Sequence, residues 1–138
     1  MEERWLKDVV ELYRQFTDEQ ENYEKLKEIF KSVAENPDYR LFISEFGGKV
    51  VCTMMGVILR NLVGKGRDFM VLENIITDKE FRGIGFAKKL YSEVEQWAKE
   101  RDCFKIVIIS NKKYKDASRF YESVGYESNS SNVFIKHL

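Results

Sequence analysis

The chain has 138 residues, of which 43% are hydrophobic and 33% charged, with 23 basic and 23 acidic side chains. This size and composition predict a single globular domain, residues 1–138, with a core of its own. Zero net charge disfavours nucleic-acid binding through bulk electrostatics. The longest apolar stretch, roughly Val50 to Leu59, is too short to span a bilayer, and the charged opening "MEERWLKD" does not resemble a signal peptide.

The few cysteines and histidines limit the chemistry that the chain can carry. Cys52 and Cys103 lie in apolar runs without CxxC spacing, which is typical of buried, reduced thiols and favours a cytoplasmic location. His137 is the only histidine, so neither a histidine-built metal site nor a Ser-His-Asp triad is expected.

The first third of the chain has the pattern of two helices. Apolar residues recur at helical spacing from Trp5 to Phe16 and again from Tyr23 to Val33, with a break near Thr17. Asn36-Pro37 is expected to end the second helix, because a residue that precedes proline avoids the helical conformation.

Three strands are predicted next. The first two, about Leu41–Phe46 and Lys49–Arg60, are joined by the tight turn Gly47-Gly48 and form a hairpin. The third, about Phe69–Thr77, follows a loop that contains two further glycines.

The second half alternates helix and strand. Apolar positions from Gly85 to about Arg101 fall on one face of a helix. The continuously apolar segment Phe104–Ser110 is typical of a strand buried in the middle of a sheet. A short helix follows, with Asp116 as its N-cap and Gly125 as its C-terminal stop. Tyr126 and the closing "NVFIKHL" are expected to supply one or two further strands.

The stretch "FRGIGFAKKL", Phe81 to Leu90, places two glycines at the start of the long helix. A dinucleotide-binding GxGxxG motif would need a third glycine where Lys88 stands, and it would follow a first strand. The "GKG" segment Gly64–Gly66 lacks the Ser or Thr that holds magnesium in a nucleotide-triphosphate loop. Neither of these phosphate-binding motifs fits the sequence.

A third motif fits. Arg82-Gly83-Ile84-Gly85-Phe86-Ala87 matches the Arg/Gln-x-x-Gly-x-Gly/Ala pattern of the GNAT acyl-CoA N-acyltransferases. The surrounding "VLENIITDKEFRGIGFAKKLYSEVEQWA" resembles the strand, pyrophosphate loop and long helix of that family, and "ASRFYESVGY" resembles its later Ala-x-x-Phe-Tyr-x-x-x-Gly-Phe/Tyr segment. Together these segments cover roughly Phe69 to Tyr126, so the resemblance does not depend on a glycine-rich turn alone.

The resemblance implies an α/β fold with a GNAT-like mixed, mostly antiparallel and twisted sheet, a splayed parallel strand pair and flanking helices. The parallel pair would be Phe69–Thr77 and Phe104–Ser110. The family usually opens with a strand, whereas this chain opens with a helix, so the first family strand is expected to be absent. Its absence would expose an edge beside Leu41–Phe46, which a partner chain, such as a second copy in a homodimer, could cover.

The resemblance also implies acetyl-CoA as co-substrate. Backbone groups of Ile75, Ile76 and Thr77 would hold the pantetheine arm and the thioester. The pyrophosphate would accept hydrogen bonds from unpaired N–H groups at the helix start. The residues of this cradle are Arg82, Gly83, Ile84, Gly85, Phe86, Ala87 and Lys88.

Three polar residues near the cofactor leave alternatives open. Lys88 or Lys89 could reach the outer phosphate, or both could simply belong to a solvated helix face. Asn111 would be a further cofactor ligand, although it lies six residues before Ala117 and the family places its asparagine three or four before that alanine.

Two residues are candidates for the chemistry. Tyr121 matches the tyrosine of the family's Phe-Tyr pair and could protonate the leaving thiolate; alternatively it packs in the core as an aromatic side chain of a short helix. Glu73 shares a strand face with Val71 and Ile75, whose apolar side chains could raise its pKa and make it a better base. Alternatively, Glu73 lies at an edge and pairs with Arg or Lys.

The leading interpretation is an N-acetyltransferase that moves acetyl from acetyl-CoA to a primary amine on a small molecule, peptide or protein by direct attack. The alternative is a non-catalytic acyl-CoA-binding or partner-binding domain of the same fold. The acidic residues Asp18, Glu19, Glu21 and Glu24 would suit a cationic acceptor, although such a cluster is more often only solvated.

Overall fold

The computed structural model describes residues 3–17, 22–128 and 131–138. The elements along the chain are α1 (Glu3–Tyr13), α2 (Tyr23–Glu35), β1 (Tyr39–Phe46), β2 (Lys49–Leu59), β3 (Phe69–Thr77), the 3-10 helix η1 (Lys79–Phe81), α3 (Phe86–Glu100), β4 (Ile106–Ile108) and α4 (Lys115–Ser123). The predicted order of helices and of the first three strands is confirmed. The chain divides into two compact units, Met1–Val107 and Ile108–Leu138, which are described separately.

The sheet has the order β1-β2-β3-β4. Strands β1 and β2, and β2 and β3, are antiparallel, whereas β3 and β4 are parallel. Gly47 and Gly48, with φ of 59° and 76°, both adopt the left-handed conformation, which a tight hairpin turn requires. The predicted mixed sheet with one parallel pair is therefore confirmed.

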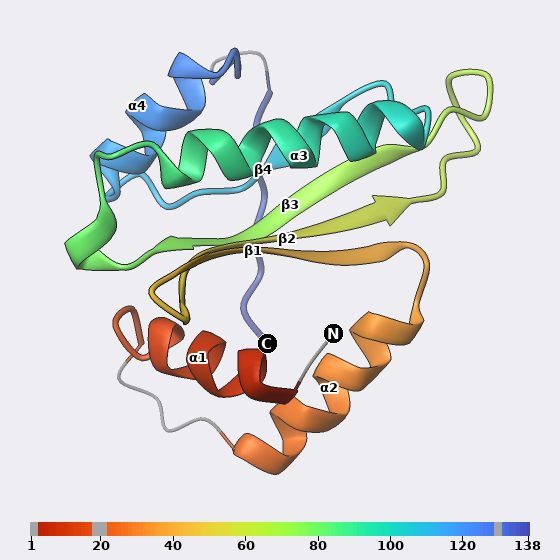
Figure 1. Cartoon of the computed structure of the whole chain (residues 1–138). Helices are drawn as coiled ribbons and strands as arrows, with labels where there is room; N and C mark the ends of the chain where they lie inside the picture. The colour runs from red at the N-terminus through yellow and green to blue at the C-terminus, as the bar shows by residue number, and fades with distance from the viewer. Residues whose placement is uncertain (1–2, 18–21, 129–130) are drawn as a thin grey trace. The chain divides into compact units, whose positions relative to one another are not determined.

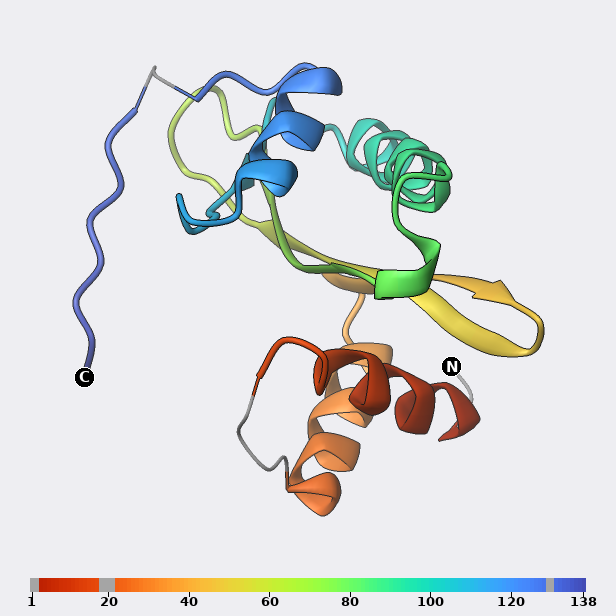
Figure 2. The same ribbon diagram turned by 90° about the vertical axis from the view of Figure 1, so that its left-hand side faces the viewer.

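Helices cover both faces of the sheet in the first unit (Figures 1 and 2). Helices α1 and α2 lie on one face and α3 on the other. On the α1 side, Val9 and Leu12 pack with Val50 in one buried cluster. On the α3 side, a Cβ atom at Gly56 would lie 3.0 Å from the Trp97 ring, so the glycine makes room for the indole. The core of this unit holds the strands in a fixed register beneath α3.

Strand β1 forms one end of the sheet, and the described residues that precede it, 3–17 and 22–38, contain no strand. The expected absence of a first strand therefore holds for the part of the chain that the structure describes. The outer edge of β1 has no neighbouring strand in the sheet order, as predicted from the helical opening of the chain.

Three predictions for the second half of the chain differ from the structure. Strand β4 has only three residues and ends the sheet of the described residues instead of lying in its middle. The prediction of closing strands is wrong for the described residues: residues 126–128 and 131–138 form no strand, and Phe134 is 91% exposed. An apolar segment forms a strand only where another backbone pairs with it.

The start of α4 also differs from the prediction. The N-cap position is Tyr114, without a side-chain cap hydrogen bond, and Asp116 lies inside the first turn. The Ser118 N–H donates to the Tyr114 carbonyl at 3.2 Å, so the chain is already helical where the cap was expected. A carboxylate in the first turn still interacts favourably with the helix dipole. Gly125, with φ of 99°, follows the helix as predicted.

Candidate active site

The loop between β3 and α3 presents unpaired backbone donors. Gly83 and Gly85 have φ of 75° and 97°, and Gly85 is the N-cap of α3. The first helical hydrogen bond runs from the Lys89 N–H to the Gly85 carbonyl at 3.0 Å. Within the described residues, the N–H groups from Gly83 to Lys88 donate to no backbone carbonyl. These groups carry the partial positive charge of the helix start, so the loop is suited to an anion.

The space in front of the two glycines is open. A Cβ atom at Gly83 or Gly85 would meet no protein atom within 4 Å. Protein packing therefore does not require glycine here, whereas the positive φ does. An anion could approach the backbone closely at both positions.

The side chains of the loop divide into exposed and packed groups. Ile84 is 67% exposed, Lys88 and Lys89 are exposed, and Ala87 is half-buried. Arg82 is exposed, and its Nε–H donates to the Thr77 carbonyl at 3.2 Å. Its guanidinium lies 5.1 Å from the centre of the Phe16 ring, which fixes its direction.

Phe86 anchors the helix start instead of lining the open space. Its ring lies 5.8 Å from that of Phe81 and 5.9 Å from that of Phe46, in edge-on arrangements. Phe46 and Phe81 are themselves 5.5 Å apart. This aromatic cluster of Phe46, Phe81 and Phe86 ties the loop to the end of β1.

Strand β3 is interrupted by a bulge. Thr53 pairs with Ile76 and Met55 pairs with Glu73, so Asn74 and Ile75 together oppose the single residue Met54. Asn74 has φ of 51°, a conformation that asparagine tolerates better than most residues. The bulge was not predicted from the sequence, although an asparagine within an apolar strand is a signal for one.

The bulge is held by a buried hydroxyl. Thr53 is 0% exposed, and its Oγ1 donates to the Asn74 carbonyl at 3.1 Å. The same Oγ1 lies 3.5 Å from the Tyr13 hydroxyl of α1. Burial is the main cause that raises the pKa of Tyr13. The irregular backbone of β3 is therefore a fixed feature of the sheet.

The end of β3 contributes backbone and little side-chain chemistry. Ile76 packs against the cluster of Val9, Leu12 and Val50, so its side chain belongs to the core. The Thr77 Oγ1 lies 3.3 Å from the Sγ of Cys52, a free thiol whose pKa is raised, chiefly by burial. The side chains of Ile76 and Thr77 are therefore engaged with other residues of the first unit.

Glu73 lies on β3, between β2 and β4, and not on an outer strand. Its side chain is half-buried, and burial raises the pKa of its carboxyl. No ion pair joins it to another described residue. The alternative of an ion pair with Arg or Lys therefore does not hold among the described residues.

Tyr121 and Asn111 belong to the second unit. The half-buried Tyr121 ring lies 5.8 Å from that of Phe120 and 6.1 Å from that of Tyr126. The Asn111 Oδ1 accepts a hydrogen bond from the Lys113 N–H at 3.0 Å, which shapes the turn before α4. Both residues therefore have contacts within the second unit.

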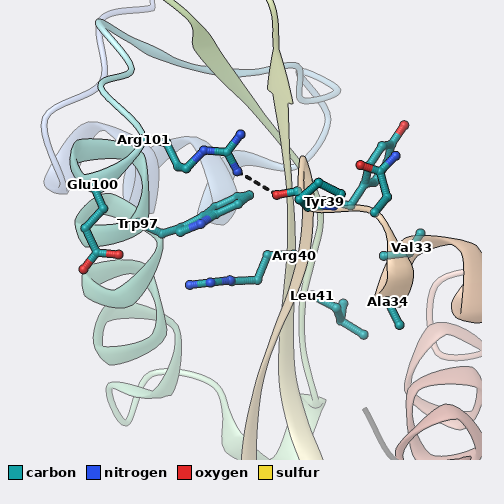
Figure 3. Close-up of a pocket in the computed structure, with 10 residues that line it drawn as sticks. Val33, Ala34, Tyr39, Arg40, Leu41, Trp97, Glu100 and Arg101 are labelled. Atoms are coloured by element: carbon teal, nitrogen blue, oxygen red, sulfur yellow. Dashed lines mark hydrogen bonds between the residues drawn. The ribbon is translucent and has the colours of Figure 1, made fainter.

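A hollow of about 560 Å³ lies at the outer edge of β1 (Figure 3). Arg40 and Arg101 lie on opposite sides of the Trp97 indole, 4.8 and 5.6 Å from its centre. Arg101 also forms an ion pair with Asp38. Trp97 lies near the C-terminal end of α3, about 18 Å along the helix from Gly85 at a rise of 1.5 Å per residue. The hollow is therefore separate from the loop Arg82–Lys88, which we call the phosphate loop after the family motif that it resembles.

The fold and the phosphate loop agree with a comparison of the whole sequence with known families. The sequence model of the Acetyltransferase (GNAT) family matches residues 6–126. The chain therefore belongs to the GNAT acetyltransferase family, as its motifs predicted.

Three individual relatives are at most 24% identical to this chain. A glucosamine 6-phosphate N-acetyltransferase of Trypanosoma brucei brucei is 24% identical over 89 residues, which span 64% of this chain but only 58% of that protein. The solved glucosamine-6-phosphate N-acetyltransferase of Arabidopsis thaliana has a TM-score of 0.79 and 23% identity, and the match covers 96% and 92% of the two chains. An aminoglycoside acetyltransferase from an uncultured soil metagenomic sample has a TM-score of 0.83 and 14% identity, and the match covers 100% and 92%. At such identities these structures show the fold alone.

The described residues contain no group of three or more His, Cys, Asp or Glu side chains arranged for a metal ion. None of the described helices is long and apolar enough to cross a bilayer.

Proposed function

We propose that this protein transfers the acetyl group of acetyl-CoA to a primary amine by direct attack within a ternary complex. Family membership implies acetyl-CoA as the co-substrate. The observation that carries the proposal is the row of N–H groups from Gly83 to Lys88, which donate to no backbone carbonyl of the described residues. A pyrophosphate can accept several such hydrogen bonds at once.

The surroundings of this row fit the rest of the co-substrate. The open space at Gly83 and Gly85 leaves room for phosphate oxygens. Arg82 is held beside the loop by its bond to the Thr77 carbonyl and would add positive charge. The main chain of Ile75, Ile76 and Thr77 would hold the pantetheine arm as a strand-like partner. Lys88 would reach the outer phosphate, and Asn111 would be a further ligand.

The reaction requires little covalent chemistry from the protein. The amine nitrogen forms a bond to the acetyl carbonyl carbon, the carbon–sulfur bond breaks, and the sulfur leaves as a thiolate. Glu73 would take the proton that the amine loses, directly or through a water, and a raised pKa suits a carboxylate to that task. Tyr121 would give a proton to the thiolate. Positioning of the two substrates supplies much of the remaining rate.

The acceptor class is the least defined part of the proposal. Relatives are named for acetylating glucosamine 6-phosphate or aminoglycosides, and both are amines on a sugar. Amino sugars are therefore the first acceptors to test, followed by peptides. The acidic cluster Asp18, Glu19 and Glu21 lies outside the described residues, and Glu24 lies in the first turn of α2.

The test begins with calorimetric titration of acetyl-CoA into the wild-type protein and into Gly85→Glu. A carboxylate at Gly85 would repel the pyrophosphate and strain a residue with φ of 97°, so affinity should fall by about 100-fold or more. Gly66→Glu is the matched control, since Gly66 has φ of 70°, equally open surroundings and a place in a different loop. ADP should bind weakly to all three proteins.

The second step separates the enzyme from its alternative. Thiol release is followed with the acceptor panel, and acceleration over buffer by any amine would support transfer. Tight binding of acetyl-CoA with no amine-dependent thiol release would instead favour the non-catalytic acyl-CoA-binding domain. If the wild type failed to bind acetyl-CoA, both would be wrong.

A further inference from the structure

Asp78 is a buried charge directly after β3, at the entrance to the phosphate loop. The residue is 3% exposed. Its Oδ1 accepts a hydrogen bond from the Glu80 N–H at 3.0 Å, and its Oδ2 accepts from Gln15 Nε2 at 3.0 Å and from Lys49 Nζ at 3.4 Å. A carboxylate can be buried only where such partners replace water. The Glu80 hydrogen bond is the main cause that lowers the pKa of Asp78.

Gln15 reaches this carboxylate from the turn that follows α1. Its amide makes two contacts, because Nε2 donates to Asp78 while Oε1 accepts from the Lys79 N–H at 3.2 Å. The next residue, Phe16, lies beneath the Arg82 guanidinium at 5.1 Å. Two consecutive residues of the α1 turn therefore hold the two ends of η1, the short helix that leads into the glycines.

These contacts fix the segment that the proposed function needs. The Asp78 N–H donates to the Val51 carbonyl at 2.8 Å, which ties the entrance of the loop to β2. On the other side, Phe81 packs against Phe46 and Phe86. Between these two anchors, the hydrogen bonds of Gln15 with Asp78 and Lys79 join the start of η1 to the turn that follows α1.

We infer that Gln15, Asp78 and Lys49 form a positioning network that sets the backbone of the phosphate loop, so that the end of α1 controls the affinity for acyl-CoA. This inference rests on the proposed function. A ligand bound by main-chain N–H groups is held well only when those groups already point at it, since ordering a loose loop reduces affinity. Through this network, a helix remote in sequence from the glycines would determine how well they bind.

The variant that tests the inference is Gln15→Ala. It removes both amide contacts but leaves the Glu80 and Lys49 bonds to Asp78 intact. The dissociation constant of acetyl-CoA, measured by calorimetry, should rise about five- to tenfold. Turnover at saturating acetyl-CoA should stay within about twofold of the wild type, because no group near the reacting atoms changes. Hydrogen exchange should become faster at the amides of Lys79, Glu80 and Phe81, whose N–H groups are hydrogen-bonded in the wild type.

Arg14→Ala is the matched control. Arg14 is the exposed neighbour of Gln15 and pairs only with Glu11, at 3.1 Å, among the described residues. Its loss should change neither the affinity nor the exchange of the loop. A purely structural role of Gln15 would lower the melting temperature without a specific change in acetyl-CoA affinity or loop exchange.

The outcomes separate this inference from the proposed function. If the wild type does not bind acetyl-CoA, both are overturned. If the wild type binds and folded Gln15→Ala binds equally well, only the network is overturned. Should Gln15→Ala fail to fold, Lys49→Met serves instead. The Lys49 side chain is 51% exposed, and its substitution removes only the longest of the three hydrogen bonds to Asp78, at 3.4 Å. A rise of about twofold in its dissociation constant would support the network, and an unchanged value would refute it.

Discussion

The two units of the chain differ in how their residues are held. In Met1–Val107, buried side chains such as Leu12, Met54 and Val94 are at most 1% exposed. In Ile108–Leu138, no described residue is buried, and the aromatic side chains of α4 are half-buried. The phosphate loop, the bulge and Glu73 belong to the first unit, whereas Tyr121 belongs to the second.

The proposed binding loop and the proposed proton donor therefore lie in surroundings that differ in burial. The loop is fixed by hydrogen bonds and aromatic packing from α1, β1 and β2. The Tyr121 ring contacts those of Phe120 and Tyr126 in the second unit. Substitutions should therefore separate into those that lower the free energy of unfolding and those that lower turnover alone.

The largest expected effect tests whether the first unit carries the stability. Leu12→Ala removes a side chain that is 1% exposed and should lower the free energy of unfolding by about 2–5 kcal/mol. Phe120→Ala, in half-buried surroundings, should cost about 1 kcal/mol. Chemical denaturation measures both, with Leu62→Ala, at a residue 101% exposed, as the control without effect. Equal losses for Leu12 and Phe120 would remove the distinction between the units.

The next effect concerns turnover. Tyr121→Phe keeps the ring and its contacts but removes the proposed proton donor, so turnover should fall about 100-fold. The Michaelis constant for acetyl-CoA and the melting temperature should stay close to those of the wild type. Tyr114→Phe is the control, since Tyr114 is 44% exposed in the same unit. Unchanged turnover in Tyr121→Phe would exclude this tyrosine as the acid.

The sequence was informative where a signal is local. The turn at Gly47-Gly48, the apolar face of α3 and the glycines before it each act over a few residues, and each was predicted correctly. The family motif added the parallel arrangement of β3 and β4, which periodicity alone does not determine. These features were enough to locate the glycine loop that we propose binds the pyrophosphate.

The sequence did not predict features that depend on distant partners. The contact of Gln15 with Asp78 joins residues 63 apart in the chain, and Thr53 holds Asn74 across two strands. Asp78 alone has the pattern of an ordinary turn residue. The predicted closing strands failed for the opposite reason: Phe134 and its neighbours have a strand-like pattern, but a strand also needs a backbone to pair with.

The smallest change in stability is expected for Glu73→Gln, and its sign is opposite to that of the loss expected for Leu12→Ala. Burial raises the pKa of Glu73 in the folded protein. The protonated carboxyl therefore contributes stability at any pH below the pKa of a glutamate in the unfolded chain, which is about 4.3. This support is lost as the pH rises through the folded pKa. Glu73→Gln replaces a desolvated charge with a neutral group of the same shape, so its melting temperature at neutral pH should not fall below that of the wild type.

Glu73→Gln should lower the activity, although it should not lower the melting temperature. As a base, Glu73 works only when deprotonated, so the wild-type rate should rise with pH on its acid side, at a higher pH than an exposed glutamate would give. Glu73→Gln should lose that rise and about tenfold or more of the rate at neutral pH. The pH profile of kcat/KM and a thermal melt of each protein measure both effects. A variant that keeps the acid limb would show that another group is the base, and Glu73 would then be a buried charge that the fold tolerates without catalytic use.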